Sequence, residues 1–133
     1  MIPTGEDADS GTAATQVLAD YYRAFSNLDL QTVLPYFHEP SLFIGPQGVY
    51  AASTYALVEA AIKPVMADLR SRGYARSELI VRNVQSLSST AALVVGVAVR
   101  YQLDGHEMER VGVTYVLHKT AGGWKIAVFI VHD

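Results

Sequence analysis

The clearest hydrophobic pattern lies in the last third of the chain, where three apolar stretches alternate with short turns. We predict β-strands over Thr90–Leu103, Glu107–Lys119 and Trp124–His132. Asp104 and Gly105 separate the first two strands. An Asp-Gly pair favours a two-residue hairpin turn, because both turn positions need positive φ. A glycine-rich turn joins the last two strands, so the pattern indicates an antiparallel meander.

The first half of the chain carries helical periodicity instead. Apolar residues spaced by three and four predict a helix over Thr12–Ser26 and a second long helix that starts at a Ser53 cap and runs to Arg72. Between them, Asp29 is expected to cap a short helix. Pro35 should bend that helix or end it early, because proline disfavours helical geometry in the preceding residue and lacks an amide hydrogen.

Two further strand regions complete the order of elements. A small hairpin is predicted from Leu42–Ile44 and Gly48–Tyr50, and a long strand over Tyr74–Leu87. Residues 1–11 are small, acidic and turn-prone, and are expected to form a loose arm. Residues 12–133 then form a single α+β domain, in which a curved mixed sheet wraps around three helices.

The turns set a register for the meander. A two-residue turn at Asp104-Gly105 places Arg100 opposite Glu109, and an even-length second turn places Tyr115 beside Val128. One face then mixes small, apolar and polar residues: Val94, Gly96, Ala98, Arg100, Glu109, Val111, Val113, Tyr115, Trp124, Ile126, Val128, Ile130 and His132. The opposite face is more uniformly apolar: Leu93, Val95, Val97, Val99, Tyr101, Met108, Arg110, Thr114, Val116, Ala127, Phe129 and Val131.

The two faces suggest different roles. Small residues such as Gly96 and Ala98 leave room beneath the helices, and a few polar groups that converge on an apolar hollow are typical of a ligand pocket. The flatter, uniformly apolar face is suited to burial against a second copy of the chain. We therefore expect an internal cavity on one side of the sheet and a homodimer interface on the other.

Composition excludes several classes of function. The formal net charge is −3 and the ten Lys and Arg residues are scattered, which argues against a nucleic-acid partner. The chain has no cysteine, hence no disulfide or thiol chemistry. Its four histidines lack metal-site spacing and no phosphate-binding glycine motif is present, so no metal and no cofactor are expected. Without a signal-like or membrane-spanning stretch, a cytoplasmic location and no membrane partner are expected.

Three short motifs resemble one known superfamily. They are residues 21–29 (Tyr-Tyr-Arg-Ala-Phe-Ser-Asn-Leu-Asp), residues 34–40 (Leu-Pro-Tyr-Phe-His-Glu-Pro) and residues 123–126 (Gly-Trp-Lys-Ile). Together with the order of elements they resemble the NTF2-like superfamily, which includes nuclear transport factor 2, ketosteroid isomerase and SnoaL-like polyketide cyclases. The resemblance implies a cone-shaped α+β fold and identifies the fold better than the reaction.

The resemblance to ketosteroid isomerase can be followed residue by residue. Tyr21 matches the tyrosine of the first helix that donates a hydrogen bond to the developing enolate, and Tyr115 aligns with the second donor. The family's general base is an aspartate, but the matching segment here is residues 43–46 (Phe-Ile-Gly-Pro), which contains no carboxylate. Without a base the isomerase loses its central proton transfer, so steroid isomerisation is not expected.

Four residues remain candidates for acid–base chemistry, and each has a structural alternative. Tyr21 and Tyr115 are candidate donors or core tyrosines, while Glu109 paired with Arg100 either serves a pocket or is a surface ion pair. His132 is a candidate general base beside Glu109, or part of a frayed end. The residues expected to contact a ligand are Arg100, Tyr50, Phe43, Val113 and Val128.

Three functions follow from these expectations. The first is a SnoaL-like protein that binds a small hydrophobic molecule between the helices and the sheet. The second is an acid–base enzyme, an isomerase, cyclase, dehydratase or hydrolase, that acts on a polyketide- or terpene-like compound. The third is a non-catalytic, dimeric interaction module, which predicts a cavity filled by side chains.

Overall fold

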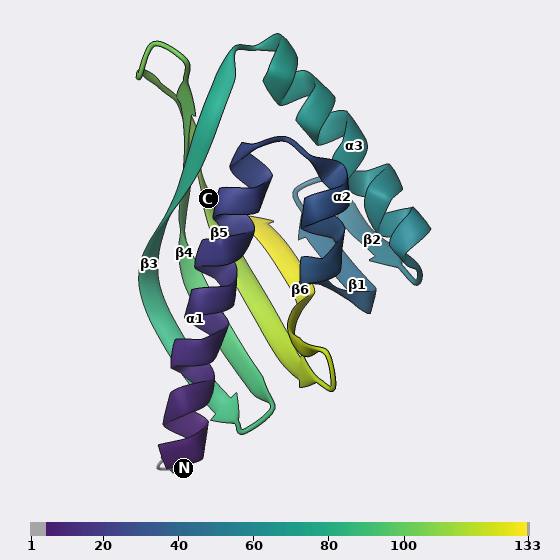
Figure 1. Ribbon diagram of the computed structural model, residues 1–133, viewed down its shortest axis with the longest axis vertical. Coiled ribbons are helices and arrows are strands. Elements are labelled where there is room, and N and C mark those ends of the chain that lie inside the picture. The colour runs from purple at the N-terminus through teal and green to yellow at the C-terminus, as the bar shows by residue number, and fades with distance from the viewer. Residues whose placement is uncertain (1–4, 133) are drawn as a thin grey trace.

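The computed structural model describes residues 5–132 and confirms the α+β class (Figure 1). Three α-helices and a 3₁₀ turn accompany one six-stranded sheet in this part of the chain. The elements are α1 (Gly5–Ser26), α2 (Leu30–Val33), η1 (Leu34–Tyr36), β1 (Phe37–Gly45), β2 (Gly48–Ala52), α3 (Tyr55–Ser71), β3 (Tyr74–Ser88), β4 (Ala91–Gln102), β5 (Glu107–Thr120) and β6 (Gly123–His132).

The sheet has the strand order β2-β1-β6-β5-β4-β3, with β1 parallel to β6 and every other pair antiparallel. It is strongly curved, and the helices lie on one side of it, with α1 running along the inside of the curve (Figure 1). The core forms between α1, α3 and this inner face. None of the described helices is long and apolar enough to cross a bilayer.

Helix α1 is longer than the sequence pattern predicts. It begins at Gly5, so the prediction of a loose arm is wrong for residues 5–11, while residues 1–4 lie outside the described part of the chain. Gly11 explains how the extra turns pack. Its amide donates to the Ser86 hydroxyl of β3 at 3.1 Å, and a Cβ at Gly11 would lie 2.8 Å from that oxygen. The missing side chain lets α1 and β3 approach closely.

The other two helices begin at side-chain caps. Asp29 caps α2 as predicted, because its carboxylate accepts a hydrogen bond from the amide of Gln31. The chain tightens into η1 at Pro35, which ends α2 after one turn, as expected. Helix α3 is capped by Thr54 rather than Ser53, and the Thr54 hydroxyl accepts a hydrogen bond from an amide of the first turn.

The predicted register between β4 and β5 is confirmed over most of its length. Val94 lies opposite Tyr115 and Arg100 opposite Glu109. The turn itself differs from the prediction, because it contains three residues, Leu103–Gly105, instead of two. A β-bulge at Met108 of β5, just after the turn, offsets the extra residue, so the strands regain the expected pairing.

The predicted register between β5 and β6 is wrong by one residue over the second half of β6. Close to the turn the strands pair as expected, with Leu117 opposite Ile126, but Val116 lies opposite Val128. Ala127 is therefore an extra residue in β6, and this bulge moves every later side chain to the other face of the sheet. Tyr115 consequently lies opposite Phe129 instead of Val128.

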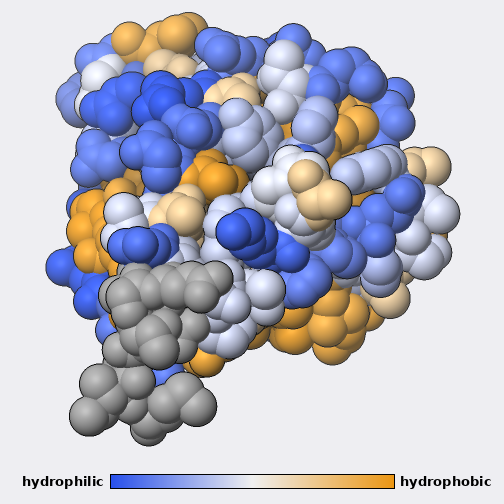
Figure 2. Space-filling model, turned by 60° about the horizontal axis from the view of Figure 1, so that its bottom comes forward, coloured by the Kyte–Doolittle hydropathy of each residue, from blue (hydrophilic) through white to orange (hydrophobic). Residues whose placement is uncertain are grey.

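No helix of the described chain covers the outer face of the sheet (Figure 1). The outer face is the side of the sheet that points away from α1 and α3, and its central residues are apolar and partly exposed. They are Leu42, Ile44, Leu93, Val95, Val97, Val116, Val128 and Ile130. The side of the molecule that Figure 2 shows is different, because polar residues there separate the apolar areas into small patches.

Candidate functional site

A cavity of about 290 Å³ lies between α1, α3 and the inner face of the sheet. Aromatic and aliphatic side chains form most of its wall. The lining residues are Tyr21, Tyr22, Phe25, Phe37, Phe43, Ala61, Ile62, Val65, Ser77, Ala98, Arg100, Glu109, Val111, Val113, Tyr115, Phe129 and Val131. The predicted hollow beneath the helices is therefore present, with a few polar groups in an apolar wall.

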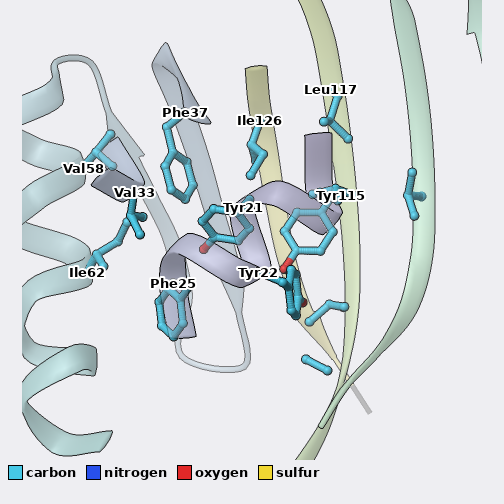
Figure 3. Close-up of a cluster of buried hydrophobic side chains, with 14 of the residues drawn as sticks. Tyr21, Tyr22, Phe25, Val33, Phe37, Val58, Ile62, Tyr115, Leu117 and Ile126 are labelled. Atoms are coloured by element: carbon cyan, nitrogen blue, oxygen red, sulfur yellow. The ribbon is translucent and has the colours of Figure 1, made fainter. Parts of the chain in front are cut away.

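Tyr21 is held at the centre of the aromatic wall. Its ring is 5% exposed and meets Tyr22, Phe37 and Tyr115 edge to face. No hydrogen bond joins its hydroxyl to another residue of the described chain, and Figure 3 shows this hydroxyl on the side of the ring that faces away from Tyr115. Burial raises the pKa of Tyr21, so the hydroxyl stays protonated and acts as a donor.

Tyr22 and Tyr115 form a hydroxyl pair next to Tyr21. Their oxygens are 2.7 Å apart and buried (Figure 3). Burial raises the pKa of Tyr22 to about 12 and the pKa of Tyr115 well above its ordinary value. Because one hydroxyl donates to the other, one of the two protons stays free for a further acceptor. The Tyr115 ring also stacks on Phe129, with centroids 4.9 Å apart.

Arg100 and Glu109 bring charge to the cavity. Nη1 of Arg100 is 3.7 Å from Oε1 of Glu109, and the same carboxylate oxygen accepts a hydrogen bond from Nη2 of Arg72 at 2.5 Å. The side chain of Arg100 is only 21% exposed, and its Nε is buried with no hydrogen-bond partner. The cross-strand pair predicted from the register is present, but Arg72, which follows the end of α3, is the closer partner of Glu109.

Several of the predicted site residues meet at this cavity. Tyr21, Tyr115, Glu109 and Arg100 line it, and so do the predicted ligand contacts Phe43 and Val113. Tyr50 does not line it. Its ring is 39% exposed, contacts Phe43 and donates its hydroxyl hydrogen bond to the Leu57 carbonyl.

Two predicted site residues lie on the wrong face of the sheet. The bulge at Ala127 turns Val128 and His132 away from the cavity. His132 instead pairs with Thr114 on the outer face, where Nε2 and the Thr114 hydroxyl are 2.8 Å apart. The prediction that His132 stands beside Glu109 as a base is therefore wrong, and Val131 occupies the cavity wall.

Tyr22 and Phe129 line the cavity but were not among the predicted site residues. For Tyr22 a signal was available, because Leu18, Tyr22 and Phe25 are spaced by four and three along α1 and all three are buried. For Phe129 no sequence signal was available, because the bulge at Ala127 decides which face of the sheet it lies on.

Among residues 5–132, no three His, Cys, Asp or Glu side chains gather closely enough to hold a metal ion.

A family model described as NTF2-like protein (DUF6841) matches residues 9–133. The chain belongs to this NTF2-like family. The resemblance noted from the three short motifs is confirmed, and so is the expected fold. No curated protein is significantly similar to the chain.

Solved structures share the NTF2-like fold over almost the whole chain. An NTF-2 like protein of unknown function from Shewanella oneidensis MR-1 has a TM-score of 0.74 and 21% identity, over 90% of this chain and 95% of that one. Aln2 from a Streptomyces species has a TM-score of 0.75 and 14% identity, over 100% and 94%. A ketosteroid isomerase-like protein from Erwinia carotovora atroseptica has a TM-score of 0.64 and 15% identity, over 91% and 93%.

Proposed function

We propose that this NTF2-like protein binds a small, largely hydrophobic molecule in the cavity between α1, α3 and the sheet. The observation that carries the proposal is the open volume of about 290 Å³ inside an apolar, aromatic wall. This volume is close to the lower end of the range for small-molecule pockets, roughly 300–1,000 Å³. Apolar walls favour a ligand whose surface is also apolar, since each Å² removed from water contributes about 25 cal/mol.

Tyr21 supplies polarity where the ligand would lie. The Tyr21 side chain is buried, and its hydroxyl is protonated and has no hydrogen-bond partner in the described chain, so an oxygen acceptor on the ligand can satisfy it. The rings around Tyr21 fix its orientation, which lowers the entropic cost of forming that bond. The ligand is thus expected to combine an apolar body with at least one oxygen.

A thermal-shift screen of hydrophobic metabolites tests the proposal, with a pair of matched variants. Val65 of α3 lines the cavity and is partly exposed, so Val65→Trp should narrow the cavity without burying new bulk in the core. Val49→Trp places the same side chain on β2, away from the cavity. Compounds that raise Tm should lose this effect in Val65→Trp and keep it in Val49→Trp. Equal shifts in both variants would contradict binding in the cavity.

An acid–base enzyme is the alternative, and one observation favours it. Glu109 lines the same cavity as Tyr21 and Tyr115, so a carboxylate and two tyrosine side chains border one space. In this proposal Glu109 removes a proton from the substrate, and one hydroxyl donor, from Tyr21 or from the Tyr22–Tyr115 pair, stabilises the oxygen on which charge develops. A compound from the screen should then exchange hydrogen for deuterium in D₂O, and Glu109→Gln should stop the exchange. Exchange at the same rate in Glu109→Gln would remove Glu109 from the mechanism.

A second copy of the chain is the proposed cover for the outer face. This face is apolar at its centre, and a two-fold axis lets one such patch cover its own copy. An interaction module without a ligand is less well supported, because it predicts a filled cavity. Val97→Asp should convert the dimer to a monomer in sedimentation, whereas Leu103→Asp, in the exposed β4–β5 turn, should not. A wild-type monomer at micromolar concentration would contradict the dimer.

A further inference from the structure

The guanidinium of Arg100 lacks a hydrogen-bond partner among residues 5–132, although the side chain is only 21% exposed. No hydrogen bond joins it to another residue of the described chain, and its closest carboxylate oxygen, on Glu109, is 3.7 Å away. Its Nε is fully buried and unpaired. Guanidinium carries five N–H donors, and leaving buried donors unpaired is costly. An acceptor that enters the cavity can reach the part of the Arg100 side chain that stays exposed there, and can pair with donors that the chain leaves unpaired.

Glu109 only partly compensates the charge of Arg100. The two are the charged residues of the described wall, but the carboxylate is hydrogen-bonded to Arg72, which is the closer partner. Arg72 also pairs with Asp68, whose side chain is 62% exposed and lies outside the wall, where water screens its charge. Within the cavity the guanidinium is therefore the less compensated group. A negative charge on a ligand would balance it, and low local polarity strengthens such a pair.

The aromatic wall and the cationic Arg100 border the same cavity. Arg100 lines the same cavity as Tyr21, Tyr22 and Tyr115, and its charge acts on all three hydroxyl groups, lowering each pKa against the stronger effect of burial. A molecule that reaches Arg100 with one end can rest on the aromatic wall with the rest of its surface. Its acidic group would also lie within the field of the hydroxyl donors.

We propose that the ligand is a small hydrophobic acid with one negative charge, whose carboxylate binds the guanidinium of Arg100 while its apolar body fills the aromatic part of the cavity. This inference rests on the proposed function and names the chemical class of its ligand. The planar guanidinium matches the two oxygens of a carboxylate, a match that an ammonium group does not offer. Glu109, held by Arg72, remains a fixed partner that orients Arg100.

Calorimetry with an acid and its neutral isostere tests the charge directly. We choose 2-naphthoate against 2-naphthamide, with benzoate against benzamide and decanoate against decanamide as smaller and longer pairs. Wild-type protein should bind at least one acid tenfold or more tightly than its amide. Arg100→Gln should remove this preference, while Arg110→Gln should keep it. Arg110 is the matched control, because it follows Glu109 on β5, lies on the other face of the sheet and pairs with Glu107.

Arg100→Lys distinguishes a loss of ligand binding from a loss of folding. If Arg100→Gln fails to fold by circular dichroism, Arg100→Lys keeps the charge without the planar fork, and should retain a preference for the acid with weaker affinity. Equal affinity for acid and amide in wild-type protein, with both lost in Val65→Trp, would overturn the anionic ligand and leave the binding function intact. No binding of any of the six probes would overturn both proposals.

Discussion

The hydroxyl pair of Tyr22 and Tyr115 allows a quantitative test of how the cavity wall is held together. The two oxygens are 2.7 Å apart, and both side chains are buried. Tyr115→Phe removes one oxygen and leaves the Tyr22 hydroxyl without its partner, and Tyr22→Phe does the reverse. A net hydrogen bond contributes about 0.5–1.5 kcal/mol, and a stranded buried hydroxyl costs about 1–3 kcal/mol. Because both side chains line the cavity, where water can enter, we expect each single change to cost about 1–2 kcal/mol.

The double variant Tyr22→Phe, Tyr115→Phe should cost less than the sum of the single changes. Both oxygens are then absent, no hydroxyl is stranded, and the rings can keep their edge-to-face packing at 6.3 Å. We expect a coupling free energy of about 1 kcal/mol between the two positions. The loss in the double variant should therefore be about 1 kcal/mol smaller than the sum of the two single losses.

Urea unfolding followed by circular dichroism measures all four proteins. The free energy of unfolding comes from linear extrapolation, and equal m-values would show that the unfolding transition itself is unchanged. Tyr36→Phe is the control, because Tyr36 is half-buried and packs its ring against Tyr21; its loss should stay within about 0.5 kcal/mol. Additive losses in the double variant would refute the reasoning, since the hydroxyls would then act independently.

Three further changes probe the rest of the domain. Gly96→Ala should destabilise by about 1–3 kcal/mol, since its Cβ would lie 2.5 Å from the backbone oxygen of Ile80, whereas Gly45→Ala, with nothing within 4 Å, should change the urea midpoint little. Leu117→Ala should cost about 2–5 kcal/mol in the same assay, because Leu117 is fully buried in the core. The pKa of Tyr22 rises from 10.0 to about 12 on folding, so its stabilising contribution is complete below pH 10 and is lost as the pH rises through 12. Urea midpoints between pH 9 and 12 should therefore fall less steeply in Tyr22→Phe than in wild type, and parallel curves would contradict this.

The sequence pattern predicted the order of elements and the pairing of β4 with β5, because both depend on local information. Alternating apolar residues define which side chains share a face, and the Asp-Gly pair marks the turn. The predicted pairing of Arg100 with Glu109 is correct although the predicted turn length is wrong, because a bulge next to the turn restores the register. The start of α1 depends instead on a contact between residues far apart in sequence, Gly11 and Ser86 of β3. The polar pattern of residues 5–11 does not predict this contact.

Gly96 was correctly noted as a small residue on the inner face, but the role predicted for it was wrong. Its small size suggested space for a ligand, yet Gly96 is not part of the cavity wall. The neighbouring strand β3 explains why a glycine occupies position 96. β3 has a bulge after Val81, opposite Gly96, and the carbonyl of Ile80 comes so close that a Cβ would not fit. Glycine is needed there for the approach of two backbones, a contact between residues far apart in sequence.

The bulge at Ala127 determines which chemistry can reach the cavity. A strand without it would present His132 beside the charged groups, and an imidazole there could act as a base near neutral pH. With the extra residue, Val131 and Phe129 face the cavity, while His132 pairs with Thr114 on the outer face. The described wall then contains protonated tyrosines, one guanidinium with an unpaired Nε and one carboxylate that faces two arginines. Such a set binds an anion more readily than it removes a proton, which is why binding is the leading proposal and catalysis the alternative.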